Sequence, residues 1–328
     1  YDKIFNLIYL RKNKQDYRNY KNKGFFWSRI FFLKIFFSCF FPMKRILKIN
    51  NPDYLIAHLI TSLPLILFFL FKFNTKLILR ISGEPNLNFF RKYLWKIVSK
   101  KIFAITCPCE TTKQFFINEN IFDSKKIHVL FDPVLTINEF KNKKNKEIES
   151  DLRNTKYFLS VGRLTKQKNF SFLISCFNKL RKNYPEIKLV ILGEGEEKNN
   201  LQNQILSLGL ENIVILKGFK ENVFSYMKNA TCLILASLYE NPGHVLIEAA
   251  ISNCPIISSD CPTGPAEFLN DGKAGHLFEL NNERDLIREV ENFINQSDKE
   301  KIKRTVMAKK NSINYTIFRH YLSLRKII

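Results

Sequence analysis

The stretch Ser237-Leu-Tyr-Glu-Asn-Pro-Gly-His-Val-Leu-Ile-Glu-Ala249 follows the apolar run Thr231-Cys-Leu-Ile-Leu235 and leads into a helical pattern. The apolar run predicts a buried strand. Pro242-Gly243 predicts a helix start, because proline lacks the amide that a first helical turn cannot use. The amides of residues 244–246 are then expected to be free at a helix N-terminus, where they attract anions. A strand, a polar loop and a helix form the repeating unit of an α/β fold.

The same unit recurs through the second half of the chain. Strands are expected at 157–161, 188–192, 213–216, 231–235 and 255–258, with helices at 170–182, 197–208 and 243–252. This alternation predicts a complete doubly wound domain with a parallel sheet. Such sheets bind ligands at the carboxyl ends of their strands.

A looser alternation occupies the first half. Strands are expected at 54–57, 76–81, 102–106 and 126–130, with an apolar helix at 63–71. Residues 138–156 are polar, charged and free of a strand pattern, which predicts a linker or an exposed connection. A chain of 328 residues is long enough for two domains. We expect them at 1–140 and 141–328.

Two more loops after predicted strands carry groups suited to phosphate. Gly162 lets the backbone approach a ligand, and Arg163 and Lys168 supply a planar fork and a point charge that suit a diphosphate. Gly193 and Gly195 follow another strand. They are compatible with a phosphate cradle and equally with a simple tight turn, and both interpretations stay open.

Two carboxylates bracket the predicted helix start. Glu240 precedes it, where it could meet sugar hydroxyls, and Glu248 lies just over one turn inside it, where it could reach a ribose. The neighbours of Glu248 are apolar, so a carboxylate buried there needs a partner. Anion-binding amides between two hydroxyl-binding acids fit a nucleotide-sugar.

Together these motifs resemble family 4 of the retaining glycosyltransferases. That family has the α/β GT-B fold, in which two Rossmann-like doubly wound domains face each other across a cleft. The likeness rests on Glu240-x7-Glu248, on Gly162-Arg163 with Lys168, on Gly193-x-Gly195, and on the run 258–272. It is dense over about residues 155–280 and loose over about 50–135.

The resemblance implies a role for each matching residue. Arg163 and Lys168 would hold the donor diphosphate, Glu248 the ribose and Glu240 the transferred sugar, so the expected catalytic residues are Glu240, Arg163 and Lys168. Phe219 would lie near the base. The expected donor-binding residues are Gly162, Gly193, Gly195, Phe219, Asn241, Pro242, Gly243, His244, Val245, Leu246, Glu248, Gly264 and Glu267. The Thr263-Gly264-Pro265 loop with Glu267 is a variant associated with enzymes that build bacterial polysaccharides on lipid carriers.

The first half departs from the family pattern. Such enzymes normally begin with a strand and a Gly-rich loop, and no such loop precedes residue 50. We therefore expect the first, acceptor-side domain to be truncated at its N-terminus. Many relatives carry a histidine at the end of the strand where this chain reads Arg80-Ile-Ser-Gly-Glu84, a segment that contains the acceptor-side candidates Ser82 and Glu84. His58 is a third candidate, with a core histidine as the alternative.

The expected chemistry needs no cofactor or metal. No Asp-x-Asp pair occurs in the sequence, and this argues against the single-domain transferases whose cation sits on that pair. The two cations and the helix start would stabilise the departing diphosphate instead. The resemblance implies a retaining transfer from a UDP- or GDP-sugar to a glycan or polyprenyl-linked acceptor. It also lets the last helix of the donor domain cross back to the first domain.

The charge predicts an anionic surface as a partner. Residues 1–150 carry 27 basic and 11 acidic side chains, against 25 and 19 in the remainder. An AT-rich genome would load both halves alike, so the asymmetry favours an anionic membrane surface. Residues 30–41, rich in Phe and flanked by Arg29, Lys44 and Arg45, could lie in a membrane interface or pack as a core helix.

The cysteines and the apolar runs indicate where in the cell the protein is located. Seven cysteines, an odd number, do not form a disulfide framework, and those at 39, 176, 232 and 254 are expected in the core. Residues 30–41 and 63–71 are both shorter than the roughly 20 residues of a spanning helix. We expect a cytoplasmic protein, peripheral on the inner face of the cytoplasmic membrane.

Two functions from other classes remain as alternatives. Nucleic-acid binding would use the positive charge, but no RNA- or DNA-binding motif is recognisable, and we expect no nucleic-acid partner. A catalytically inactive, membrane-associated relative or scaffold would be compatible with the missing Gly-rich loop.

Overall fold

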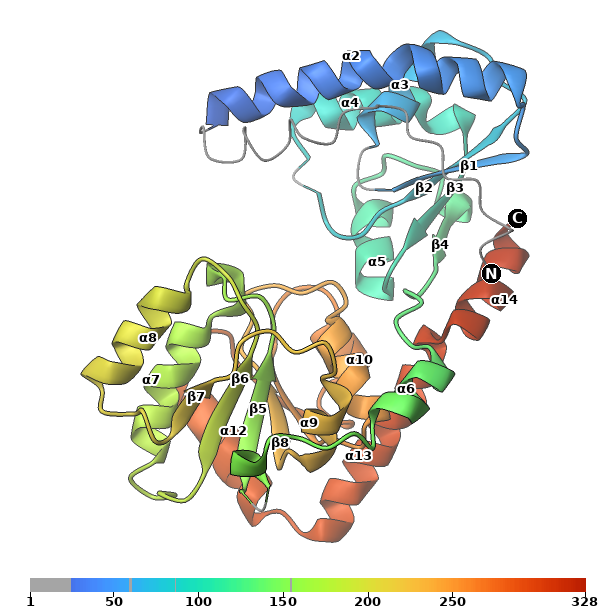
Figure 1. Ribbon diagram of the computed structural model, residues 1–328. Coiled ribbons are helices and arrows are strands. Elements are labelled where there is room, and N and C mark those ends of the chain that lie inside the picture. The colour runs from blue at the N-terminus through green and yellow to red at the C-terminus, as the bar shows by residue number, and fades with distance from the viewer. Residues whose placement is uncertain (1–24, 59–60, 86, 154) are drawn as a thin grey trace. The chain divides into compact units, whose positions relative to one another are not determined.

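The computed structural model describes residues 25–58, 61–85, 87–153 and 155–328. Their contacts divide the chain into two units (Figure 1). The first unit comprises Tyr1–Thr106 and Phe116–His128, and the second comprises Cys107–Phe115 and Val129–Ile328. The expected domain boundary after residue 140 falls within helix α6 (Ile137–Lys143) of the second unit.

The first unit contains a four-stranded sheet whose strands follow chain order. They are β1 (Tyr54–His58), β2 (Lys76–Arg80), β3 (Ile102–Cys107) and β4 (Ile127–Val129). The first three pair in parallel, with β1 and β2 aligned from Tyr54↔Lys76 to His58↔Arg80. The expected strands are confirmed to within two residues at each end.

The helices of the first unit form a layer on this sheet. Helix α3 (Ser62–Leu70) contacts both α2 (Phe25–Ile49) and α4 (Phe89–Val98). Helix α5 (Glu110–Asn118) precedes β4, and its residues up to Phe115 belong to the second unit. Helix α3 is almost wholly apolar and buries Leu65 and Leu67 completely, as expected for a helix enclosed on several sides. The predicted apolar helix at 63–71 is thus confirmed, and the segment 30–41 lies inside the longer α2.

The second unit contains a six-stranded sheet in the order β10-β9-β8-β5-β6-β7, and all its strands are parallel. The strands are β5 (Tyr157–Val161), β6 (Lys188–Leu192), β7 (Val214–Leu216), β8 (Cys232–Leu235), β9 (Ile256–Ser259) and β10 (His276–Phe278). The order reverses between β5 and β8, which confirms the doubly wound domain. That reversal is where such sheets bind ligands.

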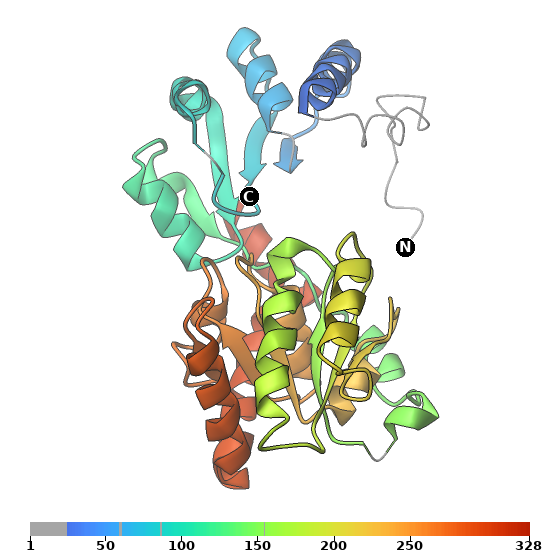
Figure 2. The ribbon, with the colours of Figure 1, turned by 90° about the vertical axis from the view of Figure 1, so that its left-hand side faces the viewer.

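Helices cover both faces of this sheet (Figure 2). Alternate residues of β5 point to opposite faces, so that Leu159 joins one apolar core and Phe158 the other. The first core includes residues of α9 (Phe224–Asn229), α10 (His244–Ile251) and α13 (Asp298–Ser312). The second includes residues of α7 (Phe170–Leu180), α8 (Lys198–Ser207) and α12 (Glu283–Asn295). The short α11 (Pro265–Phe268) and the last helix α14 (Ile317–Ile327) complete the unit.

Two expectations about the fold need correction. The segment 138–156 is not simply a linker, because α6 and a 3-10 turn at Ser150–Leu152 lie within it. Phe140, Ile148 and Leu152 are buried in the core of the second unit, and these three apolar side chains anchor an otherwise polar stretch. Cys176, Cys232 and Cys254 are buried as expected, whereas Cys39 on α2 is only partly buried.

Candidate functional site

The predicted donor-side motifs gather at one edge of the second sheet. Gly162 and Arg163 follow β5, Gly193 follows β6, and the loop with Glu240 follows β8. Because all six strands are parallel, these loops share the carboxyl edge of the sheet. The strand reversal thus brings together motifs that are far apart in sequence.

Lys168 and Glu240 form the centre of this edge. The Lys168 Nζ forms an ion pair with Glu240 Oε1, which also accepts a hydrogen bond of 2.6 Å from the Ser237 hydroxyl. The two charged side chains are only 15% and 7% exposed. A Cβ at Gly162 would lie 3.2 Å from the Lys168 methylenes, so glycine leaves the room in which the lysine extends. The pair therefore holds both charges in a fixed place.

The glycines after β6 act mainly through close backbone packing. A Cβ at Gly193, whose φ is +149°, would fall 1.8 Å from the Gly162 carbonyl oxygen, and one at Gly195 would fall 2.3 Å from that of Leu164. The Gly193 amide donates to the Gly218 carbonyl at 2.8 Å. These contacts match the tight-turn interpretation, and they fix the loop that borders the neighbouring pocket.

A pocket of about 280 Å³ lies beside these loops. Its wall includes Arg163 and Phe219, both expected at a donor site, and also Lys220, which the sequence analysis did not single out. The full lining is Val161, Gly162, Arg163, Leu192, Gly193, Glu194, Phe219, Lys220 and Val223. A glycine-lined hollow with an exposed aromatic ring and cations has the chemistry to receive a nucleoside and its phosphates.

Lys220 is held in this wall by a charged network. Its Nζ lies 2.6 Å from Glu149 Oε1, and the Tyr226 hydroxyl donates to the other oxygen of that carboxylate. Burial opposes ionisation of Glu149, but the hydrogen bonds from Lys220 and Tyr226 prevail and lower its pKa to about 2. Glu149 lies in the segment expected to be a linker, so no local signal marked it.

The start of α10 is built differently from the expectation. Gly243, with a φ of +91°, precedes the first helical residue, and its carbonyl accepts the Leu246 amide at 2.9 Å. The expectation of a free Leu246 amide is therefore wrong, because a tight first turn satisfies it. Within the described chain no group accepts the Val245 amide, and the Asn241 Oδ1 is buried without a hydrogen-bond partner.

Glu248 lies partly buried on α10, and its carboxylate has no hydrogen bond or ion pair among the described residues. Burial raises the pKa of Glu248 to about 7, Glu139 adds to this rise, and His244 opposes it. An acid without a partner at such a place is costly unless a ligand supplies donors. This is what a residue that accepts from ribose hydroxyls requires.

Asp132 is another residue at this site that its local sequence did not indicate. Its Oδ2 lies 3.0 Å from the Nε2 of His244, the first residue of α10. The two residues are 112 positions apart, so only the fold brings them together. The carboxylate orients the imidazole at the edge of the candidate site.

Gly264 and Glu267 border the α10 loop from the other side. A Cβ at Gly264 would fall 2.5 Å from the Pro242 carbonyl oxygen, and the Thr263 hydroxyl donates to the Glu240 carbonyl. The Glu267 carboxylate caps the first turn of α5. It accepts from the Glu110 and Thr111 amides at 2.9 and 3.0 Å and from the Thr111 hydroxyl at 3.0 Å. Its donor-side role stays a prediction.

The three acceptor-side candidates belong to the first unit. His58 ends β1 directly beside Arg80 of β2, and partial burial, assisted by the Arg80 charge, lowers the pKa of His58. Ser82 and Glu84 are exposed in the loop that follows β2. The structure thus places these three residues at the carboxyl edge of the first sheet.

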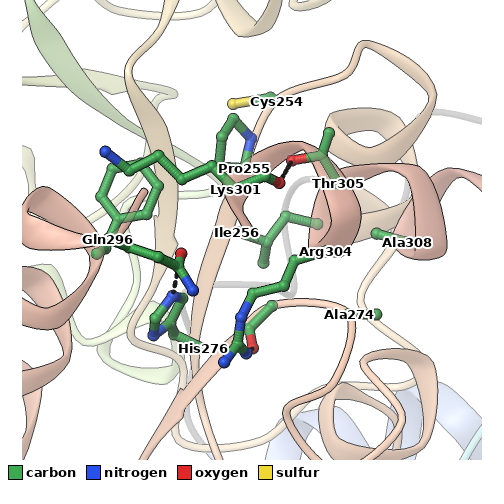
Figure 3. A pocket seen from close by; sticks show the side chains of 12 residues that line it. Cys254, Pro255, Ile256, Ala274, His276, Gln296, Lys301, Arg304, Thr305 and Ala308 are labelled. Atoms are coloured by element: carbon green, nitrogen blue, oxygen red, sulfur yellow. Dashed lines mark hydrogen bonds between the residues drawn. The ribbon is translucent and has the colours of Figure 1, made fainter. Parts of the chain in front are cut away.

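A smaller hollow lies at the amino ends of β9 and β10 (Figure 3). Its volume of about 10 Å³ matches roughly one water molecule. Arg304 donates to the carbonyls of Gly272 and Gly275, and His276 contacts Glu289 and Gln296. With its polar groups already paired, this hollow acts as a structural junction.

The described residues contain neither a candidate membrane span nor a candidate metal cluster. No helix there is both long and apolar enough to cross a bilayer. Nor does that part of the chain contain a cluster of three or more His, Cys, Asp or Glu side chains able to hold a metal ion.

Comparison with known proteins gives a family and a fold. The model of the family described as "Glycosyl transferases group 1" matches residues 141–312. An uncharacterised glycosyltransferase of Methanocaldococcus jannaschii is 34% identical over 247 residues, which cover 70% of this chain and 61% of that protein. A Campylobacter jejuni enzyme is 28% identical over 67% of this chain and 61% of its own length. Its name is N-acetylgalactosamine-N,N'-diacetylbacillosaminyl-diphospho-undecaprenol 4-alpha-N-acetylgalactosaminyltransferase. The chain thus spans about three fifths of these relatives.

Among solved structures, Staphylococcus aureus TarM, crystallised with fondaparinux, alpha-GlcNAc-glycerol and UDP, superimposes with a TM-score of 0.70 at 22% identity. The match covers 88% of this chain and 58% of TarM. At this identity the likeness shows the fold, and it confirms the predicted α/β class of GT-B type.

Proposed function

This chain belongs to the family of group 1 glycosyl transferases, and we propose that it transfers a sugar from a nucleotide-diphosphate donor to a glycan or polyprenyl-linked acceptor. The observation that carries this proposal is the grouping of Lys168, Glu240, the Arg163 pocket and Glu248 at the strand reversal of the second sheet. In this proposal the transfer serves cell-surface polysaccharide or lipopolysaccharide synthesis. A polyprenyl-linked acceptor is supported by the name of the Campylobacter relative, which includes diphospho-undecaprenol.

The donor occupies the second unit in this proposal. Its base lies in the pocket beside Phe219, and its diphosphate lies near Arg163 and Lys168. The ribose hydroxyls donate to Glu248, whose carboxylate has no other partner among the described residues. TarM was crystallised with UDP, and this favours a UDP-sugar, with a GDP-sugar as the alternative.

Glu240 and Lys168 act at the reacting end. Glu240 accepts from hydroxyls of the transferred sugar, and Lys168 neutralises charge on the departing diphosphate. The acceptor hydroxyl oxygen forms the new bond to the anomeric carbon as the bond to the β-phosphate oxygen breaks. The leaving phosphate takes the proton of the acceptor on the same face, so the anomeric configuration is retained. Cationic side chains take the place of a metal ion in this scheme.

The acceptor side belongs to the first unit, where His58, Ser82 and Glu84 are the candidate contacts. We propose that the enzyme works at the inner face of the cytoplasmic membrane, because polyprenyl-linked acceptors reside in a bilayer. The excess of positive charge in residues 1–150 supports this location.

Thermal unfolding in the presence of UDP, GDP, ADP and their common sugars tests the donor. We expect UDP compounds to raise the melting temperature, with or without Mg²⁺, because a ligand stabilises the state that binds it. Stabilisation by GDP compounds alone would show that the donor carries guanine instead of uracil. If no nucleotide stabilises the protein, it is an inactive relative. NMR of the product then tests retention, and an inverted anomeric centre would exclude the same-face mechanism.

A further inference from the structure

Helix α4 presents a second apolar face to solvent. Its Trp95 and Val98 are buried in the first unit, where Trp95 packs on Phe116 and Phe122. On the other side Phe89 and Phe90 are 77% and 81% exposed, and Tyr93 and Ile97 continue the stripe at helical spacing. One side of α4 packs in the core of the first unit, and in the described chain its other side is exposed to solvent.

Helix α2 carries a similar stripe. Phe37 and Phe41, four residues apart, are 65% and 70% exposed, and Leu33 extends the same face by one turn. The opposite side contacts α3, and the Phe40 ring meets Phe71 at 6.4 Å between centroids. This helix is thus also apolar on both its inner and outer sides.

The two stripes belong to one layer. Helix α3 contacts both α2 and α4, and both ribbon views show the three helices on the same side of the four-stranded sheet (Figures 1 and 2). At its C-terminal end α3 adds the exposed Phe69 and Leu70. An apolar surface of this extent is unusual for a protein without a partner at that surface.

Codon bias does not explain the exposed rings. A genome that favours phenylalanine would scatter exposed rings over both units. Among the described side chains, five exposed phenylalanines lie in the first unit, and only Phe219 and Phe318 lie in the larger second unit. In the second unit phenylalanines such as Phe158, Phe177 and Phe278 are fully buried.

The two helices themselves carry only basic charges, and one of these, Lys92 of α4, pairs with Glu119 at 2.6 Å. Neither 25–49 nor 89–98 contains an acidic residue. Arg45 and Lys48 are exposed near the end of α2, and Lys96 and Lys100 are exposed at the end of α4. Aromatic rings beside lysine and arginine are the pattern of helices that lie in the headgroup region of a membrane.

We propose that the outer faces of α2 and α4 form a docking surface for an anionic lipid bilayer. The docking surface consists of Leu33, Phe37, Phe41, Phe89, Phe90, Tyr93 and Ile97 with the neighbouring basic side chains. The rings insert at the headgroup level, and the basic groups contact lipid phosphates. The docking surface would bring the enzyme to an acceptor held in the membrane, and only this role rests on the proposed function.

Flotation of the full-length protein with lipid vesicles tests the surface. We expect binding to phosphatidylcholine vesicles that contain phosphatidylglycerol, and little binding to phosphatidylcholine alone. The double variant Phe89→Ser/Phe90→Ser is expected to weaken binding by about tenfold or more through the lost apolar contact. Lys96→Gln/Lys100→Gln is expected to weaken binding roughly 25-fold at low salt, since each charge near an anionic surface contributes about fivefold.

Matched substitutions on α13 of the second unit serve as controls. Ile302 and Val306 are exposed apolar residues four positions apart, and Lys299 and Lys303 are exposed lysines at the same spacing. Ile302→Ser/Val306→Ser and Lys299→Gln/Lys303→Gln are expected to change vesicle binding less than about twofold, because surface substitutions away from the docking surface have small effects. The melting temperature with and without UDP, measured on every variant, shows whether the second unit stays folded.

The outcomes separate this inference from the proposed function. If the Phe89/Phe90 and Lys96/Lys100 substitutions reduce vesicle binding and no nucleotide stabilises the protein, the docking surface is supported and the proposed donor is excluded. A nucleotide response with equal vesicle binding by the wild type and the α4 variants would overturn the surface. Equal binding to neutral and anionic vesicles would overturn the proposed contact between the basic side chains and anionic lipids. A wild-type dimer in sedimentation that Phe89→Ser/Phe90→Ser dissociates would assign the face to a second copy of the chain.

Discussion

Lys168 and Glu240 illustrate how a site can be fixed by charges that leave water together. Taking a lysine and a glutamate to 15% and 7% exposure is costly, and their mutual pairing with the Ser237 hydroxyl offsets that cost. A pair of this kind contributes little net stability compared with apolar residues of the same volume. Its presence at the strand reversal is therefore better explained by ligand chemistry than by folding.

Separate effects on folding and on activity follow from this pairing. Glu240→Ala is expected to destabilise the fold by about 3 kcal/mol, because it leaves the Lys168 charge enclosed without its partner. The double variant Glu240→Ala/Lys168→Met is expected to regain most of that stability, since the orphan charge is gone. Both variants are expected to lose sugar transfer by about 100-fold or more. Urea unfolding and a transfer assay measure the two effects.

The surface pair of the exposed Lys179 and the partly buried Glu283 provides the control for these variants. Lys179→Ala is expected to change the free energy of unfolding by less than about 0.5 kcal/mol, as is usual for surface ion pairs. Transfer by the double variant at the wild-type rate would remove both residues from the reaction.

Glu248 makes stability depend on pH. Its folded-state pKa of about 7 lies above the usual value of 4.5, so the folded protein binds the proton more tightly. The unfavourable contribution is absent below about pH 4.5, grows between about pH 4.5 and 7, and is complete above pH 7. Glu248→Gln is thus expected to stabilise the protein by about 3 kcal/mol at pH 8, and the gain should shrink towards pH 5. Urea unfolding across this range gives the difference.

Binding of a nucleotide-sugar should favour the wild type over Glu248→Gln. If ribose hydroxyls donate to the ionised Glu248, donor affinity rises with pH through about 7 in the wild type and stays flat in Glu248→Gln. Calorimetric titration with a UDP-sugar measures both profiles. Parallel profiles in the two proteins would place the ribose elsewhere.

Some residues of the site could be predicted from sequence, and others could not. Gly162, Arg163 and Glu240 lie in loops that follow strands, where the parallel topology brings the loops together, and Glu248 lies on the helix after one of these loops. Asp132 faces His244 only because the chain folds back over 112 residues, and nothing in its own neighbourhood indicates that contact.

At the scale of elements, the loop after β6 shows how one backbone supports another. Gly193 lies so close to Gly162 that a side chain there would overlap the carbonyl oxygen at 1.8 Å. Gly193→Ala therefore forces the two loops apart, in addition to straining a backbone at a φ of +149°. We expect a loss of more than about 2 kcal/mol in the free energy of unfolding, together with weaker nucleotide binding.

Gly209 is the matched control for this substitution. It also has a positive φ, of +61°, but no atom lies within 4 Å of a Cβ placed there. Gly209→Ala should cost about 1 kcal/mol from backbone strain alone and leave nucleotide affinity unchanged. Equal costs at the two positions, measured by urea unfolding, would refute the steric role of the Gly193 loop.

Elements with a continuous apolar run were predictable, and elements that depend on tertiary contacts were not. The β5 strand is buried along its whole length and its five residues are recognisable in the sequence. Helix α6 buries only Phe140, and its Lys and Asn residues resemble a linker until the fold supplies the core against which Phe140 packs. The short β10 has three residues, too few for a periodic signal.

At the scale of the whole molecule, the two units contain separate cores. The apolar clusters on the two faces of the second sheet contain no residue of the first unit. The net positive charge and the exposed aromatic rings, in contrast, concentrate in the first unit. Under the proposed function, the donor binds to the second unit and the acceptor to the first.

Hydrogen exchange in the presence of UDP tests that assignment directly. The nucleotide stabilises the unit that binds it, by about 2.7 kcal/mol at one hundred times the dissociation constant. We expect slower exchange in residues 157–168, 188–195 and 232–251, which carry the candidate donor site. Amides of β1 and β2 should exchange at the same rate with and without UDP, because their core is separate. Equal protection of both units would mean that they open as one cooperative body, and the donor could then no longer be assigned to the second unit from exchange alone. Protection confined to β1 and β2 would place the nucleotide in the first unit and contradict the assignment.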